Sequence, residues 1–171
     1  MENNKAKPLA VGLAILGIAA RLVPHAPNFT PVGGVSLFAG GRLSGWKAYL
    51  LPLALMLVTD PLVGGYSFAT PFVYASFLIY VWIGSRVRFT QNPLAIGAAA
   101  GAGSIQFFVI TNFAVWLGST ATYPHTAAGL LACYIAAIPF YGRTLLADLF
   151  YSAALFGAYA WLSRRVAVRQ S

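Results

Sequence analysis

The residues able to do chemistry are few in this chain, and most of them are predicted to lie at one end of a helical bundle. Only 8% of its 171 residues are charged, and the acidic ones are Glu2, Asp60 and Asp148. In an apolar medium an ionisable side chain is costly, so each one marks a candidate functional site. The topology derived below places these polar residues at or near the outer face: Arg21, His25, Asn28, Asp60, Tyr66, Tyr123, His125, Arg143 and Asp148.

Asp148 lies about two turns into the last predicted helix, on a polar face made by Thr144, Asp148, Tyr151 and Ser152. This face is expected to point into protein or a cavity, because an ionised carboxylate in an apolar medium needs a partner. Arg21 and Arg143 are the arginines predicted on that side, and Asp60 competes for them. The pattern leaves two roles open for Asp148, a structural pair with an arginine and a part in ligand binding.

Phe108, Asn112 and Trp116 follow one another at spacings of four in a long apolar segment, so they share one helix face. An amide beside two aromatic rings suits a flat organic ligand with polar edges, since rings stack and the amide bonds the edge. The alternative is core packing, with Asn112 bonded to a neighbouring helix.

The sequence contains few residues that fit a metal site or a catalytic motif. His25 and His125 could both reach the outer face, but two histidines without a third ligand are a weak metal site, and solvated loop histidines are favoured. Cys133 stands alone in an apolar stretch, so no disulfide forms within the chain. HExxH, GxSxG and Walker motifs are absent from the sequence. We therefore expect a protein that is not an enzyme, hydrolyses no ATP and uses no cofactor or metal.

Composition predicts an all-α integral membrane protein forming one domain, residues 1–171. Hydrophobic residues make up 59% of the chain, while about a quarter of a soluble domain is charged. The net charge of +8 would suggest nucleic acid in a soluble protein, but here the basic residues flank apolar runs, as in membrane anchoring. The first apolar run leads into PHAPN without a small-residue cleavage site, so it is expected to remain as a span.

Six membrane spans are predicted, at about residues 8–23, 31–42, 46–60, 70–86, 93–117 and 141–162. Thr30 followed by Pro31 is a good helix start. The second segment is short for ~30 Å of hydrocarbon and is expected to be tilted, shielded or extended. The apolar segment 127–138 is terminated by Pro139 and is too short to span a membrane. It is predicted to form a separate re-entrant or interfacial helix.

The basic residues orient these spans in a bacterial inner membrane with both termini in the cytoplasm. Only Arg21 and Arg143 then fall outside. The residues placed inside are Lys5, Lys7, Arg42, Lys47, Arg86, Arg88, Arg164, Arg165 and Arg169.

Small residues line one face of two segments. The first face consists of Ala6, Ala10, Ala14 and Gly17, and the second of Gly97, Gly101 and Ser104. Such faces let helix backbones approach closely in lipid. Packing within the chain is favoured, and for the first helix a docking face for another subunit is the alternative.

The chain resembles a bacterial family of multi-span membrane proteins without an assigned function, related to the substrate-binding S-components of energy-coupling factor (ECF) vitamin transporters. The stretches that carry it are PHAPNFTPVGGVSLFAG (24–40), FFVITNFAVWL (107–117) and YPHTAAGLLACYIAAIPFYGRTLLADLFY (123–151). Pro139, Phe140 and Asp148 in the last stretch are similar to the PF…GD segment of biotin-type S-components. The spacing is longer here, and Ala147 replaces the glycine.

The resemblance implies a six-helix fold with a substrate pocket near the outer face, closed by the loops after the first and third helices. It also implies docking through Ala10 and Ala14 to a shared transmembrane partner driven by ATPases. S-component-like folds also occur in chains with no known energising partner, so the fold can be inherited without transport.

The leading hypothesis is a membrane subunit that binds and transports a small organic solute, anionic or vitamin-like. Arg21 and Arg143 would contact an anionic group, and Asp60 and Asp148 would either position these arginines or bind a polar group. Asn112, Trp116 and Tyr123 would line the pocket. The candidate substrate-binding residues are Arg21, Asn28, Asp60, Asn112, Trp116, Tyr123, Arg143 and Asp148, and the candidate docking residues are Ala10, Ala14 and Gly17. The main alternative is a structural or accessory subunit of a larger membrane assembly. A metal-ion carrier using both histidines is a third.

Overall fold

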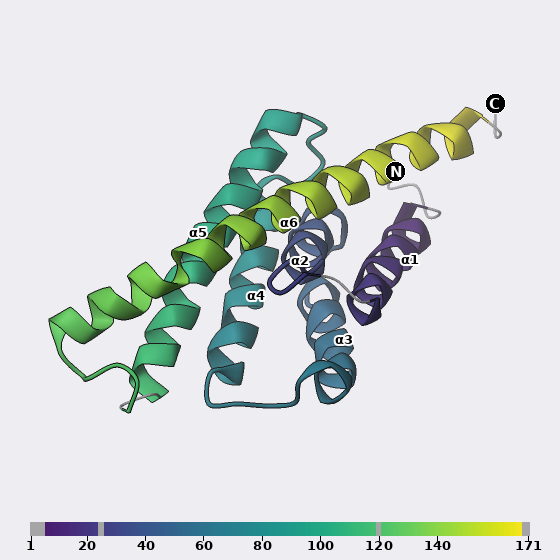
Figure 1. The fold of residues 1–171 in the computed structure, drawn as a ribbon. Helices are drawn as coiled ribbons and strands as arrows, with labels where there is room; N and C mark the ends of the chain where they lie inside the picture. The colour runs from purple at the N-terminus through teal and green to yellow at the C-terminus, as the bar shows by residue number, and fades with distance from the viewer. Residues whose placement is uncertain (1–5, 24–25, 119–120, 169–171) are drawn as a thin grey trace.

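The computed structural model describes residues 6–23, 26–118 and 121–168, and this part of the chain is all-helical, as predicted, with no strand. Six α-helices and one 3-10 turn follow one another along these ranges (Figure 1). They are α1 (Ala6–Ala19), η1 (Ala20–Leu22), α2 (Val32–Arg42), α3 (Lys47–Val63), α4 (Thr70–Arg86), α5 (Pro93–Gly118) and α6 (Ala127–Val168).

Side-chain caps and prolines explain where several helices begin. The Thr30 hydroxyl accepts a hydrogen bond from the Val32 amide (3.4 Å), and Asn92 Oδ1 accepts one from the Leu94 amide (3.0 Å). Thr126 Oγ1 accepts one from the Gly129 amide at the start of α6 (3.1 Å). These caps satisfy amides that have no partner within the helix, so the starts predicted near residues 31 and 93 fall within one residue of those observed.

The last helix differs from the prediction. A break at Pro139 was expected, with residues 127–138 forming a separate helix, but α6 runs without interruption through 42 residues, a length of about 63 Å at 1.5 Å per residue. Pro139 removes one backbone donor, yet both flanks of the helix pack on α5. The Tyr134 hydroxyl donates to the Val109 carbonyl (2.7 Å), and the Phe108 ring contacts the rings of Tyr134 and Tyr141.

The short helix α2 is the centre of the molecule. All eleven of its residues are buried, and helices α1, α3, α4, α5 and α6 all pack against it (Figure 1). At about 16 Å it is too short to cross ~30 Å of hydrocarbon. The sequence left three explanations open for its length, and the burial shows that α2 is shielded by its neighbours.

Glycines allow α2 and α4 to approach backbone to backbone. A Cβ atom added to Gly40 would collide with the carbonyl oxygen of Val81, and one added to Gly84 would collide with the carbonyl oxygen of Leu37. Each helix therefore provides a glycine where the other provides a carbonyl. Such close contact maximises dispersion attraction, the main force that holds helices together in lipid.

The small residues of α1 pack inside the same bundle. Ala10 and Ala14 are fully buried, and a Cβ atom on Gly17 would lie 2.6 Å from Cγ2 of Val35. This face therefore packs within the chain, which the sequence favoured over docking. On α5, Ser104 is fully buried, while Gly101 is half-buried and has open space around it.

Among the described helices, α5 and α6 are both long and apolar enough to cross a membrane. Neither is a buried core helix, because only 28% and 11% of their most apolar windows are buried. Large apolar side chains are also exposed on the shorter helices, including Leu16 on α1, Val58 on α3 and Trp82 on α4. The outer surface is therefore apolar while the centre holds buried polar groups.

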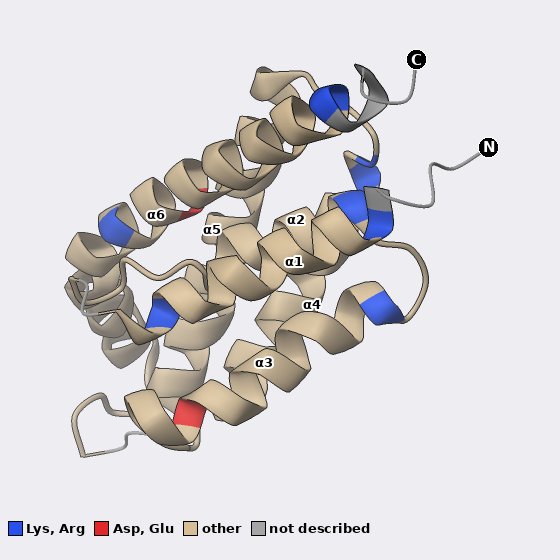
Figure 2. Ribbon diagram, turned by 90° about the vertical axis from the view of Figure 1, so that its right-hand side faces the viewer, with Lys and Arg blue, Asp and Glu red and all other residues tan. Residues whose placement is uncertain are grey.

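Basic residues gather at the end of the bundle where α1 begins and α6 ends (Figure 2). Two hydrogen bonds join α2 and α6 there to the segment between α4 and α5. Arg42 donates to the Thr90 carbonyl (2.6 Å), and Arg164 donates to the Gln91 side chain (3.1 Å). We call this the basic end and its opposite the outer end. The described residues of the basic end are Lys7, Arg42, Lys47, Arg86, Arg88, Arg164 and Arg165.

The glycine contact between α2 and α4 predicts a position-specific loss of stability. Gly84→Ala should destabilise the fold by about 1–3 kcal/mol, because the added methyl group meets a backbone carbonyl that cannot turn away. Gly101→Ala is the matched control on another helix, where a Cβ meets nothing within 4 Å. It should stabilise by about 0.5–1 kcal/mol through higher helix propensity. Unfolding titrations in mixed detergent micelles would measure both, and equal stability of the two variants would contradict the close approach.

Candidate functional site

A partly open cavity of about 160 Å³ lies between α5 and α6 towards the outer end, and we call it the inner cavity. Asn28, from the segment between α1 and α2, completes its wall. Two of the predicted site residues, Asn28 and Asn112, thus meet there although they are far apart in sequence. The lining consists of Asn28, Phe107, Phe108, Thr111, Asn112, Ala137, Phe140, Tyr141 and Thr144.

The polar side chains of the inner cavity are uncharged. Three of them donate their hydrogen bonds to backbone carbonyls of their own helix. Thr111 Oγ1 and Asn112 Nδ2 donate to the carbonyls of Phe107 and Phe108, both at 2.8 Å. Thr144 Oγ1 donates to the carbonyl of Phe140 (3.2 Å). The Asn112 amide oxygen and the hydroxyl oxygens therefore keep lone pairs for a ligand that donates hydrogen bonds.

A more open hollow of about 490 Å³, here the outer hollow, adjoins the inner cavity. Asn28 lines both, so it forms a partition between them. Its backbone has φ +63°, a left-handed conformation that asparagine tolerates better than most residues. Arg21 is the charged residue of the hollow, and the remaining walls are Leu22, Val23, Pro27, Thr30, Leu62 and Val63.

Arg21 and Asp60 form a tight ion pair beside the outer hollow. Arg21 Nη1 lies 2.6 Å from Asp60 Oδ1 and also donates to the Thr59 hydroxyl (2.8 Å). The Tyr74 hydroxyl donates to the other oxygen of Asp60 (2.5 Å). Both members of the pair are largely buried, so Asp60 holds Arg21 in place, one of the two roles that the sequence suggested for it.

Asp148 lies deeper, and its partners are hydroxyl groups. It is 2% exposed, and its Oδ2 accepts hydrogen bonds from the Tyr80 hydroxyl and from Ser104 Oγ (2.6 Å for the latter). Of the two roles left open for Asp148, the pair with an arginine is not formed among the described residues, where Arg21 is bound to Asp60 and Arg143 is exposed. Glycines make the room, because Cβ atoms on Gly33 and Gly103 would strike the Asp148 carboxylate and the Tyr80 ring.

The other predicted residues lie around the site without joining it. Trp116 Nε1 donates to the Pro124 carbonyl (3.0 Å), and the His125 ring packs on the indole, so this pair closes the loop between α5 and α6. Tyr123 is half-buried in that loop, and Arg143 is exposed on the turn of α6 that carries Thr144. His25 lies outside the described residues. Among those described, no three metal-ligating side chains come together.

Several residues of the site escaped sequence reasoning. Tyr80 and Ser104 lie 68 and 44 positions from Asp148, and Tyr74 lies 14 positions from Asp60. A tyrosine in an apolar helix carries no signal of its partner. A weaker signal existed for Tyr141, because it falls three residues before Thr144, on the polar face of α6.

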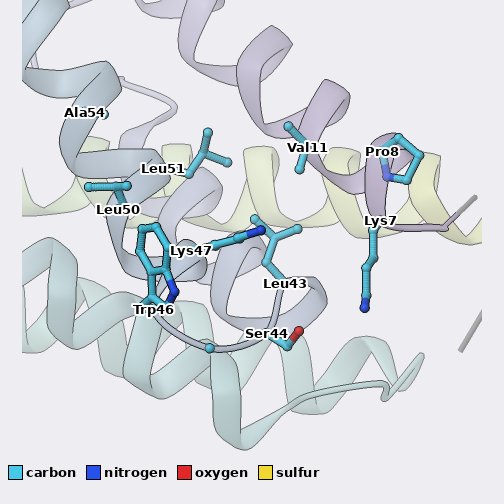
Figure 3. Close-up of a pocket in the computed structure, with 11 residues that line it drawn as sticks. Lys7, Pro8, Val11, Leu43, Ser44, Trp46, Lys47, Leu50, Leu51 and Ala54 are labelled. Atoms are coloured by element: carbon cyan, nitrogen blue, oxygen red, sulfur yellow. The ribbon is translucent and has the colours of Figure 1, made fainter. Parts of the chain in front are cut away.

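A larger groove, of about 730 Å³, opens at the basic end between α1 and α3 (Figure 3). Lys7 and Val11 line it from α1, Lys47 and Leu51 line it from α3, and Leu43 lies in the middle of the view. Its walls are mostly apolar aliphatic side chains and Trp46, which is 67% exposed. This groove offers few groups that could orient a polar solute, so the inner cavity is the better candidate site.

The chain belongs to a protein family described as a family of unknown function (DUF6580), whose model matches residues 1–169. Neither the curated proteins nor the solved structures contain a significant match to this chain. The match covers nearly the whole sequence, so the inner cavity, the outer hollow and the Asp148 cluster all lie within the matched residues.

The Asp148 cluster predicts a difference between two tyrosines. Tyr80→Phe should destabilise the fold by about 1–3 kcal/mol, because it removes a hydrogen bond from a buried carboxylate. Tyr134→Phe removes a hydrogen bond to a backbone carbonyl near the surface and should cost about 0.5–1 kcal/mol. Unfolding free energies in detergent would compare them. A smaller loss for Tyr80→Phe than for Tyr134→Phe would argue against the cluster.

Proposed function

We propose that this chain is a multi-span membrane protein that binds a small organic solute in the inner cavity, as the substrate-binding subunit of a transporter. The observation that carries the proposal is the cavity itself, in which amide and hydroxyl groups alternate with aromatic rings. Binding sites for small molecules combine apolar walls with a few oriented polar groups in this way.

The side chains that line the inner cavity limit the class of solute that can bind there. The described residues around the inner cavity carry no charge, and the polar side chains present lone pairs. An uncharged flat group with hydrogen-bond donors therefore fits the inner cavity best. The volume of 160 Å³ holds about five water molecules at ~30 Å³ each, so a vitamin-sized ligand requires the cavity to widen into the outer hollow past Asn28.

Arg21 gives the outer hollow an attraction for anionic groups. Its charge is shared with Asp60, so the hollow attracts a carboxylate weakly and the inner cavity receives the uncharged part of the solute. Arg143 lies one residue from Thr144 and is exposed, so a change of its side-chain conformation would bring a second positive charge to the rim. The anionic solute suggested by the sequence thus remains part of the proposal for the rim.

The placement in the membrane is also part of the proposal. The basic end faces the cytoplasm under the positive-inside rule, and α1, α3, α4, α5 and α6 face lipid around the shielded α2. Exposed apolar side chains on the shorter helices support six membrane helices, of which α5 and α6 alone meet the length of a full span. The cavity then lies near the extracytoplasmic face, as the S-component resemblance implies.

A structural or accessory subunit is the second candidate function. It is favoured by the internal pairing of polar groups, since Asp60 and Asp148 both have their hydrogen-bond partners within the chain. An energising subunit, if one docks on α1, would contact the outward face near Ile15 and Leu16, because Ala10 and Ala14 are buried.

Filling the cavity tests the proposed binding. Ala137 is 8% exposed and lines the inner cavity, so Ala137→Leu should occupy the space and abolish retention of a small molecule. Ala136→Leu is the matched control, because the neighbouring Ala136 is exposed and does not line the cavity. Native mass spectrometry of the purified chain would detect a co-purified solute in the wild type and the control.

Retention of the same solute by Ala137→Leu would move its site away from the inner cavity. A chain that carries protein subunits and no small molecule in the wild type would favour the accessory role.

Labelling of single cysteines tests the proposed topology. In a Cys133→Ala background, Ser44→Cys lies between α2 and α3 at the basic end, and Thr122→Cys lies in the loop between α5 and α6. A membrane-impermeant thiol reagent applied from outside should label position 122 alone, and permeabilised cells should show labelling at both. Labelling of both positions from outside would overturn the six-span topology.

A further inference from the structure

Arg42 is a buried guanidinium whose charge no carboxylate of the described chain balances. It is 8% exposed, and its Nη atoms donate to the carbonyls of Gly41 (3.0 Å) and Thr90 (2.6 Å). The described acids are engaged elsewhere, Asp60 by Arg21 and Asp148 by hydroxyl groups. Because an uncompensated buried charge is strongly unfavourable, the site needs an anion.

The guanidinium lies on a cleft of about 480 Å³ between α5 and α6 at the basic end. Arg42 Cζ lies over the Phe156 ring, 4.5 Å from the ring centroid. Arg42 and Ser152 line this cleft, and each also has one buried polar atom without a hydrogen-bond partner, Nε and Oγ respectively. Arg164, at the mouth, adds a second positive charge. The two arginines, Arg42 and Arg164, therefore form a basic part of the cleft that suits an acidic group.

Beyond these groups the cleft is apolar and unfilled. Ile96 and Leu149 form its walls, and two glycines leave it open. A Cβ atom on Gly157 would meet nothing within 4 Å, and one on Gly97 would meet only the Leu149 side chain at 3.9 Å. From Arg164 to Ser152 the cleft follows α6 for about 18 Å at 1.5 Å per residue, which suits an extended hydrocarbon chain.

We infer that this cleft binds an anionic phospholipid from the cytoplasmic leaflet, its phosphate on Arg42 and Arg164 and one acyl chain between α5 and α6. Basic pockets between membrane helices on the cytoplasmic side recognise acidic headgroups, and guanidinium groups pair with phosphate through charge-assisted hydrogen bonds. The inference requires the membrane placement proposed above and is independent of whether the inner cavity binds a solute.

The test uses the full chain in nanodiscs of phosphatidylcholine with a small fraction of phosphatidylglycerol that carries a diazirine in one acyl chain. After illumination, mass spectrometry maps the labelled peptides. The expected labels fall on the start of α5 and on residues 149–160 of α6. Labels spread evenly over all exposed helix faces, or confined to the groove between Lys7 and Lys47, would overturn the assignment.

Variants identify the groups that hold the lipid. Arg164→Gln should lower phosphatidylglycerol retention in native mass spectrometry by about tenfold, the effect of one lost charge-assisted hydrogen bond. Arg86→Gln removes the same charge at the same end outside the cleft, so it should retain the lipid like the wild type. Loss of lipid in Arg86→Gln equal to that in Arg164→Gln would reduce the effect to general surface charge.

Arg42→Gln is the direct variant, but it also removes bonds that tie α2 to the following loops. Gly157→Leu therefore tests the acyl part of the cleft without touching Arg42, with Ala154→Leu as the control on an exposed position outside it. The first should exclude the lipid and the second should not. Equal retention by both, or displacement of phosphatidylglycerol by millimolar inorganic phosphate alone, would refute the lipid site.

Discussion

The structure depends on the close approach of helix backbones around α2. Eleven buried residues form this helix, and its glycines admit the backbone of α4 and the Asp148 side chain of α6. Apolar side chains gain little by leaving lipid for a protein interior, so close contact and internal hydrogen bonds have to hold the bundle together. On α2, Gly40 allows the close contact with α4, and Gly33 leaves room for the hydrogen-bonded Asp148. The Asp148 cluster forms only because α2 brings α4 and α6 within reach of each other.

Polar groups in this chain fall into two classes by the state of their hydrogen bonds. Both carboxylate oxygens of Asp60 and one of Asp148 accept hydrogen bonds within the chain, which fits a structural contribution. Asn112 presents an unused acceptor to the inner cavity, and Arg42 and Ser152, which line the cleft at the basic end, each have one unpartnered buried atom. In so apolar a medium an unsatisfied polar group costs free energy. Where the residue that carries such a group also lines a cavity, as Asn112 and Arg42 do, a bound ligand would supply a partner.

Local signals explain which parts of the fold could be predicted. Thr30, Asn92 and the proline beside each gave helix starts within one residue, because capping depends on neighbours in sequence. Proline chemistry is equally local, and it misled at Pro139, where packing on α5 carries α6 through the missing hydrogen bond. The meeting of Asn28 and Asn112 followed from topology. The partners of Asp148 did not, since they depend on the space left by glycines on two other helices.

Helix α6 connects the three regions, because one face of it forms the wall of the inner cavity, the Asp148 cluster and the cleft at the basic end in turn. Pro139 lies between two cavity residues, Ala137 and Phe140, where the helix lacks one backbone hydrogen bond. The wall of the inner cavity is thus the part of α6 that deforms at least cost. Further along, Asp148 is held by α4 and α5. A cavity that widens for a larger solute should therefore do so by bending the outer part of α6, with the Asp148 cluster as the fixed point.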